Sequence, residues 1–218
     1  MILDFPSVEL ADEDGVLCIG GDLEVESLLL AYRRGIFPWP VSKQFPLVWF
    51  APPTRALLFL EELHIPRSLR RARNSGKFTF TIDAQFEQVI RACSESRTRK
   101  RGSATWITPA MIEGYIDFHR AGWAHSVECY TEDRLAGGLY GVAIGGMFAG
   151  ESMFYTVDDA SKLALWHLAD HLRERGVEWI DCQQLTPFFQ SLGAREVGRN
   201  EFQRLLADAA ARPVSLFD

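Results

Sequence analysis

The chain has 218 residues, of which 47% are hydrophobic, and a formal net charge of -6. This is enough apolar material for one large domain, or for one domain and a small appendage, and it excludes a disordered or fibrous protein. The segment Met1–Ser7 lacks the basic head and apolar stretch of a secretory signal, and no apolar run reaches the roughly 18 residues of a membrane span. Four scattered cysteines suit reduced thiols. We therefore expect a cytoplasmic protein without a membrane partner.

The basic residues are concentrated in one window, from His64 to Arg101. It holds ten basic and three acidic residues, a local charge of +7. A basic surface on an acidic protein is typical of phosphate binding, although a solvated helix face with a basic loop is the plainer alternative. The residues predicted to bind phosphates are Arg67, Arg70, Arg71, Arg73, Arg97, Arg99, Lys100 and Arg101.

The first 60 residues are rich in glycine, proline and aromatic side chains. They contain one helical pattern, from Asp22 to Arg34, which we expect to be capped by Asp22 and ended by Gly35. We predict a small, loop-rich N-terminal domain over residues 1–60 and a larger domain over residues 61–218.

The next part of the chain, up to Gly122, alternates helices with one strand. The pattern predicts a basic helix from Pro66 to before Gly76, a strand over Phe78–Ile82 and a helix over Asp83–Ser94. Thr108 and Pro109 are suitable N-cap and N1 residues for a further helix that ends at Ala121.

From Ala124 onward the apolar period changes to that of strands. Three strands are expected to form an antiparallel meander over 124–130, 135–143 and 147–155. A helix over Asp158–Arg175 then leads to a strand over Val177–Gln183, which should lie parallel to the third strand. A short helix near Phe188–Leu192 and a C-terminal helix from Asn200 complete the chain. The class is α+β, and the larger domain resembles the N-acetyltransferase-like (acyl-CoA N-acyltransferase-type) fold.

Two carboxylates interrupt these apolar strands, Glu151 in the third and Asp181 in the last. A buried carboxylate must be paired or hydrogen-bonded, since isolating it among apolar groups costs several kcal/mol. Because the two strands are adjacent and parallel, we expect both side chains to face one cleft and to mark the active centre. The alternative is a purely structural ion pair or cap. Alternation places Gln183 on the same face as Asp181, where Asp181 can orient the Gln183 amide.

Other polar and aromatic candidates carry weaker signals. Trp39 and Trp106 stand in loops near positive charge, where a tryptophan either stacks on a nucleic-acid base or fills the seam between domains. His167 and His171 have the spacing of metal ligands but no evident third ligand, so no metal is expected. His125 is interpreted as a core or hydrogen-bonded histidine, because no nucleophile elbow accompanies it.

Nine short motifs, in chain order and spread over nearly the whole chain, resemble those of the leucyl/phenylalanyl-tRNA–protein transferase family. They are Gly35–Trp39, Pro53–Ala56, Thr105–Thr108, Ala124–Glu128, Gly137–Val142, Gly150–Phe154, Ala160–Lys162, Ile180–Gln183 and Ser191–Ala194. The resemblance implies an enzyme that moves Leu or Phe, and less readily Met, from aminoacyl-tRNA to the N-terminal Arg or Lys of acceptor proteins. The product would be marked for N-end-rule degradation.

The resemblance also implies roles for individual residues, without a cofactor, a metal or a DNA partner. Asp181 and Gln183 would be the catalytic pair, and Trp39 and Trp106 would sandwich the terminal adenine of the tRNA. The basic helix that begins after Pro66 would hold the acceptor stem. The pocket for the donor side chain would consist of Leu139, Phe148, Glu151, Met153, Leu168 and Ile180.

Two other functions are compatible with parts of the sequence. An acetyl-CoA-dependent N-acyltransferase of the same fold requires a pyrophosphate-binding turn before the crossover helix, where this chain has Asp158 and Asp159. A non-catalytic RNA-binding module is consistent with the basic window and the tryptophans, but it leaves Glu151 and Asp181 without a role.

Overall fold

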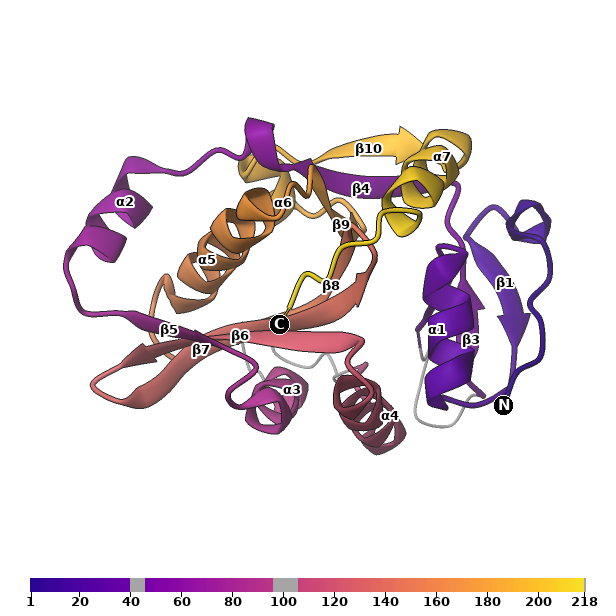
Figure 1. The fold of residues 1–218 in the computed structure, drawn as a ribbon, viewed down its shortest axis with the longest axis horizontal. Coiled ribbons are helices and arrows are strands. Elements are labelled where there is room, and N and C mark those ends of the chain that lie inside the picture. Colours follow the sequence, from indigo (N-terminus) through magenta and orange to yellow (C-terminus); the bar gives the residue numbers. More distant parts are fainter. Residues whose placement is uncertain (40–45, 96–105, 218) are drawn as a thin grey trace.

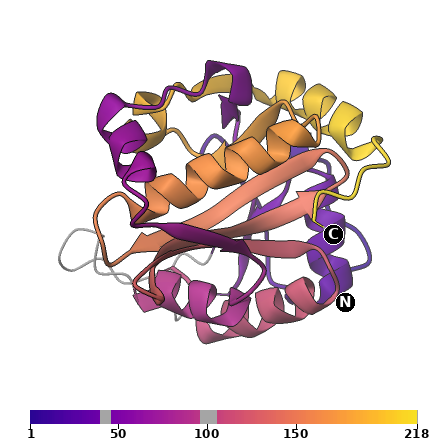
Figure 2. The same ribbon diagram turned by 60° about the vertical axis from the view of Figure 1, so that its left-hand side comes forward.

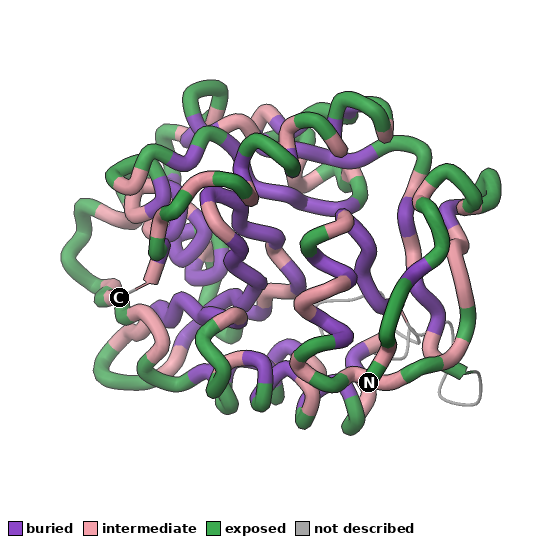
Figure 3. The backbone as a smooth tube through the Cα atoms, turned by 45° about the vertical axis from the view of Figure 1, so that its right-hand side comes forward, coloured by how far each residue is buried: buried purple, intermediate pink, exposed green. Residues whose placement is uncertain are grey.

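The structure is a computed structural model that describes residues 1–39, 46–95 and 106–217 (Figure 1). It contains a small and a large β-sheet, with helices on both faces of the large one, so the α+β class expected from the sequence is confirmed. The buried segments are mainly the central strands and the helix faces packed on them, whereas most connections are exposed (Figure 3).

The small sheet belongs to the N-terminal part of the chain. Its strands, in the order β1-β3-β2, are antiparallel and cover Val16–Ile19 (β1), Phe37–Pro38 (β2) and Val48–Phe50 (β3). Helix α1 (Val25–Arg33) lies beside this sheet, and a 3-10 turn at Val8–Leu10 precedes it (Figure 1).

Helix α1 begins three residues later than the sequence predicts. Its N-cap is Glu24, whereas Asp22 lies outside the helix and accepts hydrogen bonds from the Glu24 backbone N–H (3.1 Å) and the Ser27 hydroxyl (2.6 Å). The predicted cap at Asp22 is therefore wrong, because its carboxylate closes the turn before the helix. The predicted end is confirmed, since Gly35 adopts φ +74°, which suits a residue without a Cβ.

The large sheet has seven strands in the order β10-β4-β9-β8-β7-β6-β5. Every neighbouring pair is antiparallel except β8 and β9, which are parallel as predicted. The strands are Thr54–Phe59 (β4), Thr79–Ile82 (β5), Ala124–Thr131 (β6), Arg134–Ile144 (β7), Met147–Tyr155 (β8), Trp179–Gln183 (β9) and Arg195–Gly198 (β10). The meander, the crossover helix and the parallel strand expected for an N-acetyltransferase-like domain are thus present.

The helices cover opposite faces of this sheet. Figure 2 shows the crossover helix α5 on one face and helices α3 and α4 on the other. The helices after α1 span Arg67–Asn74 (α2), Phe86–Glu95 (α3), Pro109–Arg120 (α4), Ala160–Glu174 (α5), Pro187–Ser191 (α6) and Arg199–Ala210 (α7), with a 3-10 turn at Leu60–Glu62. Of the helices in the described ranges, none combines the length and apolar character needed to cross a membrane.

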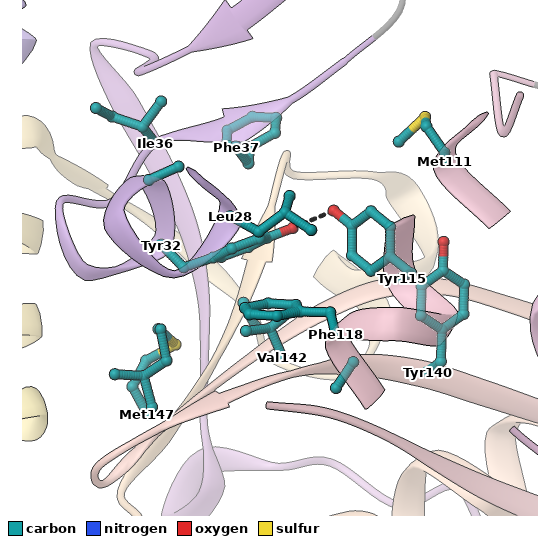
Figure 4. Close-up of a cluster of buried hydrophobic side chains, with 14 of the residues drawn as sticks. Leu28, Tyr32, Ile36, Phe37, Met111, Tyr115, Phe118, Tyr140, Val142 and Met147 are labelled. Carbon is teal, nitrogen blue, oxygen red and sulfur yellow. Dashed lines mark hydrogen bonds between the residues drawn. The ribbon is translucent and has the colours of Figure 1, made fainter. Parts of the chain in front are cut away.

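Each face of the sheet has its own hydrophobic core. The first core joins α1, α3, α4 and α7 to the sheet and includes Tyr32, Phe37 and Tyr115 (Figure 4). The second core lies under α5 and includes Phe148, Leu168 and Ile180. The first core also contains Trp49 of the small sheet, so the N-terminal part packs directly on the larger unit.

Strand β4 lies immediately before the domain boundary that we predict at residue 60. It occupies an interior position of the seven-stranded sheet, between β9 and β10, and its residues Leu57 and Leu58 are fully buried. The chain therefore enters the large sheet before residue 60. The division into two domains stays a prediction.

Candidate functional site

The site lies where β8 and β9 separate. These parallel strands are in register only at Phe148–Ile180 and Ala149–Asp181, and beyond those pairs they diverge. Divergence leaves room between two interior strands of the sheet, and a cavity of about 240 Å³ opens there.

The cavity brings together nine of the ten residues predicted from the sequence for the catalytic pair, the donor pocket and the adenine stack. All six expected pocket residues, both tryptophans and Gln183 line it: Leu139, Phe148, Glu151, Met153, Leu168, Ile180, Trp39, Trp106 and Gln183. Eight further residues, to which the sequence assigned no individual role, also line it: Tyr140, Gly150, Ser152, Leu165, Cys182, Gln184, Thr186 and Phe189. Most of the lining side chains are apolar, and Glu151 and Gln183 add buried polar groups to them. We call the apolar lining residues the apolar half of the cavity, and Glu151 with Gln183 the polar half.

A β-bulge in β8 directs Glu151 into this cavity. The register with β7 passes from Tyr140–Ser152 to Gly141–Gly150, so Glu151 is the extra residue. A bulge reverses the alternation of side chains along a strand. This explains how Phe148 and Met153, five residues apart, line the same cavity although strict alternation would place them on opposite faces.

Glu151 is buried in a hydrogen-bond network. Its Oε1 accepts from the Gln183 amide (2.7 Å), and its Oε2 accepts from the Tyr115 hydroxyl (3.2 Å). Tyr115 also exchanges a 2.5 Å hydrogen bond with Tyr32 of α1, drawn as a dashed line in Figure 4. Burial raises the pKa of Glu151 to about 7, and the hydrogen bonds from Tyr32 and Tyr115 oppose that shift. Burial also raises the pKa of both tyrosines, so they remain neutral hydroxyl donors.

Asp181 lies behind the cavity in a buried ion pair with Arg55 of β4. The guanidinium donates to both carboxylate oxygens, from Nε to Oδ1 (2.8 Å) and from Nη2 to Oδ2 (2.7 Å), and the two side chains are 2% and 1% exposed. Arg55 also lies over the rings of Phe37 and Phe202, 4.6 Å from each ring centre. Asp181 is not among the described residues that line the cavity, so the prediction that Glu151 and Asp181 face one cleft is wrong.

Gln183 connects the two carboxylates. Its backbone has φ +60°, an unfavourable value for a residue with a Cβ, and its N–H donates to Asp181 Oδ1 (2.8 Å). Asp181 therefore fixes the Gln183 backbone, whereas the side-chain amide is oriented by Glu151. The prediction that Asp181 orients the side-chain amide of Gln183 is therefore wrong, because Glu151 holds that amide.

Arg55, Tyr32 and Tyr115 were missed as site residues. Arg55 carried a usable signal, because a charge inside the apolar strand Thr54–Phe59 requires a buried partner, the same argument that singled out Asp181. The tyrosines carried none, since a tyrosine on an amphipathic helix is most often an ordinary core residue.

Trp39 and Trp106 stand together at the cavity. Their rings stack on each other, with centroids 5.0 Å apart and an angle of 15° between the planes. A base between them would need about 7 Å, two contact distances of about 3.5 Å each. In this structure the two rings therefore occupy the space that a sandwiched base would take.

The predicted phosphate-binding residues divide into two groups. Arg67, Arg70 and Arg71 are exposed on α2, whereas Arg73 is half-buried and pairs with Asp170 of α5 (2.6 Å). The other four, Arg97, Arg99, Lys100 and Arg101, lie outside the described residues.

Four histidines of the described chain, His119, His125, His167 and His171, are engaged in side-chain hydrogen bonds or ring contacts. Asp83, His119 and His125 are close enough to share a cation. However, His125 Nδ1 lies 2.7 Å from Asp83 Oδ2, and His119 Nδ1 lies 2.7 Å from the Ala124 carbonyl, which are ordinary hydrogen-bond distances. The prediction of a hydrogen-bonded His125 is confirmed. His167 stacks on Phe80, and His171 bonds the Leu216 carbonyl (2.8 Å).

The sequence of the chain is similar to those of one family of known proteins. The sequence model of the family described as "Leucyl/phenylalanyl-tRNA protein transferase" matches residues 57–207, and that of its N-terminal domain matches residues 21–53. A leucyl/phenylalanyl-tRNA–protein transferase of Syntrophobacter fumaroxidans is 52% identical over 94% of this chain and 87% of its own length. One of Anaeromyxobacter dehalogenans is 49% identical over 96% of this chain and 89% of its own. Among solved structures, that of FemX has a TM-score of 0.52 at 10% identity, covering 88% of this chain and 74% of its own, which shows a shared fold.

Proposed function

The chain belongs to the leucyl/phenylalanyl-tRNA–protein transferase family, and from this premise we propose that it moves Leu or Phe, and less readily Met, from aminoacyl-tRNA to acceptor proteins. The acceptors carry N-terminal Arg or Lys, and the product is marked for N-end-rule degradation. Aminoacyl transfer itself follows from the family, whereas the choice of amino acid and acceptor is the finer part of the proposal.

The observation that carries the proposal is the composition of the cavity between β8 and β9. The apolar half, which contains Leu139, Phe148 and Met153, and the polar half, Glu151 and Gln183, line one and the same cavity. This suits an aminoacyl ester whose side chain enters the apolar half and whose reactive carbonyl lies at the polar half. Met153 adds a flexible wall that adapts to Leu, Phe or Met.

The chemistry at the polar half is aminolysis of an ester. The acceptor α-amine attacks the ester carbonyl, the new C–N bond forms, and the C–O bond to the tRNA ribose breaks. The amine loses a proton and the leaving ribose oxygen gains one. Since the ester is already activated, holding amine and carbonyl in attack geometry supplies much of the acceleration, up to about 7–11 kcal/mol.

Glu151 and Gln183 have different roles toward the attacking amine. The Gln183 carbonyl oxygen accepts a hydrogen bond from the attacking amine while its amide group is held by Glu151 (2.7 Å). Glu151, whose pKa burial raises to about 7, is matched to accept a proton near neutral pH. Asp181 is a positioning residue, because its carboxylate is occupied by Arg55 and by the Gln183 backbone.

The tRNA lies across the mouth of the cavity and α2 in this proposal. Arg67, Arg70 and Arg71 offer exposed charge for the phosphates of the acceptor stem. Trp39 and Trp106 receive the terminal adenine, which requires the stacked pair to open by about 2 Å relative to its present 5.0 Å separation. Stacking of this kind contributes about 1–3 kcal/mol per base.

Acetyl-CoA is disfavoured as the donor by the start of α5. A pyrophosphate would bind at the N-terminus of this helix, but the N-cap is Asp159 and the preceding residue is the exposed Asp158. The side chain of Lys162 there is paired with Asp159 (2.9 Å). Two acids at this position repel a pyrophosphate.

The test is transfer of labelled Leu from charged tRNA to a peptide that begins with Arg, with labelled acetyl-CoA as a parallel donor and a Gly-initiated peptide as a parallel acceptor. We expect transfer only from the charged tRNA and only to the Arg-initiated peptide. Gln183→Ala should lower turnover by about 100-fold or more, within the range of a positioned polar group. Gln190→Ala, on the exposed surface of α6, is the matched control and should have little effect. Acetyl transfer instead of leucyl transfer would contradict the proposal.

A further inference from the structure

The segment after α7 returns across the large sheet, as the yellow trace toward the C-terminus in Figure 1 shows. Its residue Leu216 is 3% exposed and belongs to the core under α5. The Leu216 carbonyl accepts a hydrogen bond from His171 Nε2 of α5 (2.8 Å). The segment is therefore attached to the crossover helix and does not hang free.

Phe217, the next residue, is held by rings from three different elements. It stacks on His125 of β6 with centroids 4.1 Å apart and an interplanar angle of 11°. Its ring centroid also lies 5.1 Å from that of His171 of α5 and 5.7 Å from that of Phe148 of β8. Because His125 is itself bonded to Asp83 (2.7 Å), the surface on which Phe217 stacks is fixed.

Phe148 connects this contact to the cavity. Its side chain is 1% exposed and lines the apolar half of the cavity. A second contact fixes the same ring, since a Cβ placed on Gly141 of β7 would lie only 2.5 Å from Phe148 Cζ. The ring thus lies against the bare backbone of Gly141 and against Phe217. Its position follows from both neighbours.

We propose that Phe217 is a specificity-determining positioning residue for the donor pocket: it acts through Phe148 and limits the space available to the donor side chain. This inference rests on the proposed aminoacyl transfer. Phe217 itself does not line the described cavity, so its influence on the donor is indirect. Without its ring, Phe148 can move away from the cavity, and a larger apolar side chain gains room.

The experiment measures competition between leucyl- and phenylalanyl-tRNA in one reaction, with the two amino acids carrying different labels and an Arg-initiated peptide as acceptor. The measured quantity is the ratio of kcat/KM for Phe to that for Leu. Phe217→Ala should raise this ratio by about 5-fold or more, since a difference of one methylene in an apolar pocket commonly changes discrimination by about 10-fold. Phe217→Leu, which restores part of the bulk, should give an intermediate ratio.

The matched control is Val214→Ala, because Val214 lies in the same segment and packs on the same core without lining the donor cavity. It should leave the ratio unchanged. The ratio does not depend on how much enzyme is folded, so a general loss of stability in Phe217→Ala cannot imitate the effect. An unchanged ratio, or a proportional loss of both donors, would overturn the role of Phe217 alone. Absence of transfer by the unaltered protein would overturn the proposed function and this inference together.

Discussion

The two halves of the cavity between β8 and β9 are built by different means. The apolar half is formed by packing within one core, mainly from elements that follow one another along the chain: strands β7 and β8, helix α5 and strand β9. The polar half is held by pairs that reach elements outside this run: Arg55 of β4 with Asp181 of β9, and Tyr115 of α4 with Glu151 of β8. A pocket for a side chain needs only shape, whereas the reactive end needs charges whose partners come from distant parts of the chain. The following changes test this division.

The largest effect is expected from removing Arg55. Arg55→Met leaves the buried Asp181 carboxylate unpaired and should lower the free energy of unfolding by about 3–5 kcal/mol. At about 2–4 °C per kcal/mol for a chain of this size, the melting temperature should fall by about 10 °C, measured by calorimetry. Arg91→Met is the matched control, because its pair with Glu87 is exposed to solvent and its loss should leave the melting temperature nearly unchanged.

A double variant separates the charge from the packing at this pair. Arg55→Met with Asp181→Leu removes both charges and should recover much of the lost stability, since paired apolar replacements of buried ion pairs are often neutral. Transfer activity should stay low, because the Gln183 backbone has lost its acceptor. A double variant with full activity would show that Asp181 has no positioning role.

The apolar half is tested by adding bulk to it. Leu139→Phe fills part of the cavity and should reduce kcat/KM for phenylalanyl-tRNA by about 10-fold more than for leucyl-tRNA. Competition between the two donors in one reaction measures this difference. Equal losses would mean that Leu139 does not contact the donor side chain.

The division between the halves also explains which features the sequence predicts. The spacing of apolar residues was enough to predict the meander, the crossover helix and the parallel pair β8–β9, because these elements follow from local hydrophobic patterning. β4, whose interior position depends on pairing with β9 and β10, was not anticipated. The same limit applies to the small sheet, whose strands have at most four residues and no clear alternation.

Within the site, the pocket residues came from a resemblance, and their physical arrangement needed the structure. Strict alternation separates Phe148 from Met153, and only the bulge at Glu151 reconciles them. A bulge has no reliable sequence signal, since it depends on the register of the neighbouring strand. Asp181 was singled out as a buried charge, but its partner Arg55 is 126 positions away, and the sequence gives no pairing over such a distance.

The polar half should also determine the pH dependence of transfer. Below pH 7 Glu151 becomes protonated, one oxygen turns from acceptor to donor, and the Gln183 amide or the Tyr115 hydroxyl loses its partner. Turnover at pH 6 should therefore be about 10-fold below its plateau, one pKa unit corresponding to a factor of ten. Both profiles are corrected for the protonated fraction of the acceptor α-amine, whose reference pKa is about 8. After this correction, Glu151→Gln should give a lower but flat profile over pH 6–8. A wild-type profile that is flat over this range would contradict the role of Glu151.

The raised pKa of Glu151 also predicts how the free energy of unfolding changes with pH. Because the pKa of Glu151 is higher in the folded protein than the ordinary value of 4.5, the folded state binds the proton more tightly. The contribution of Glu151 to the free energy of unfolding therefore falls as pH rises from about 4.5 to about 7. Denaturant titrations at several pH values give the free energy of unfolding as a function of pH. This dependence should differ between the wild type and Glu151→Gln between pH 4.5 and about 7. Parallel pH dependences for the two proteins would contradict a raised pKa of Glu151.

The smallest effect is expected from Tyr115→Phe, which removes one hydroxyl at 3.2 Å from Glu151 Oε2. That hydrogen bond favours the ionised carboxylate, so its loss should raise the pKa of Glu151 further above its value of about 7. The acid limb of the pH–turnover profile should then move to higher pH, by up to about one unit, because a single hydrogen bond to a charged group contributes about 1.5 kcal/mol or somewhat more. Tyr130→Phe on β6 is the control and should leave the limb in place. Movement toward lower pH would mean that the Tyr115 hydroxyl does not stabilise the charged form, and that the polar half is organised by Arg55 and Gln183 alone.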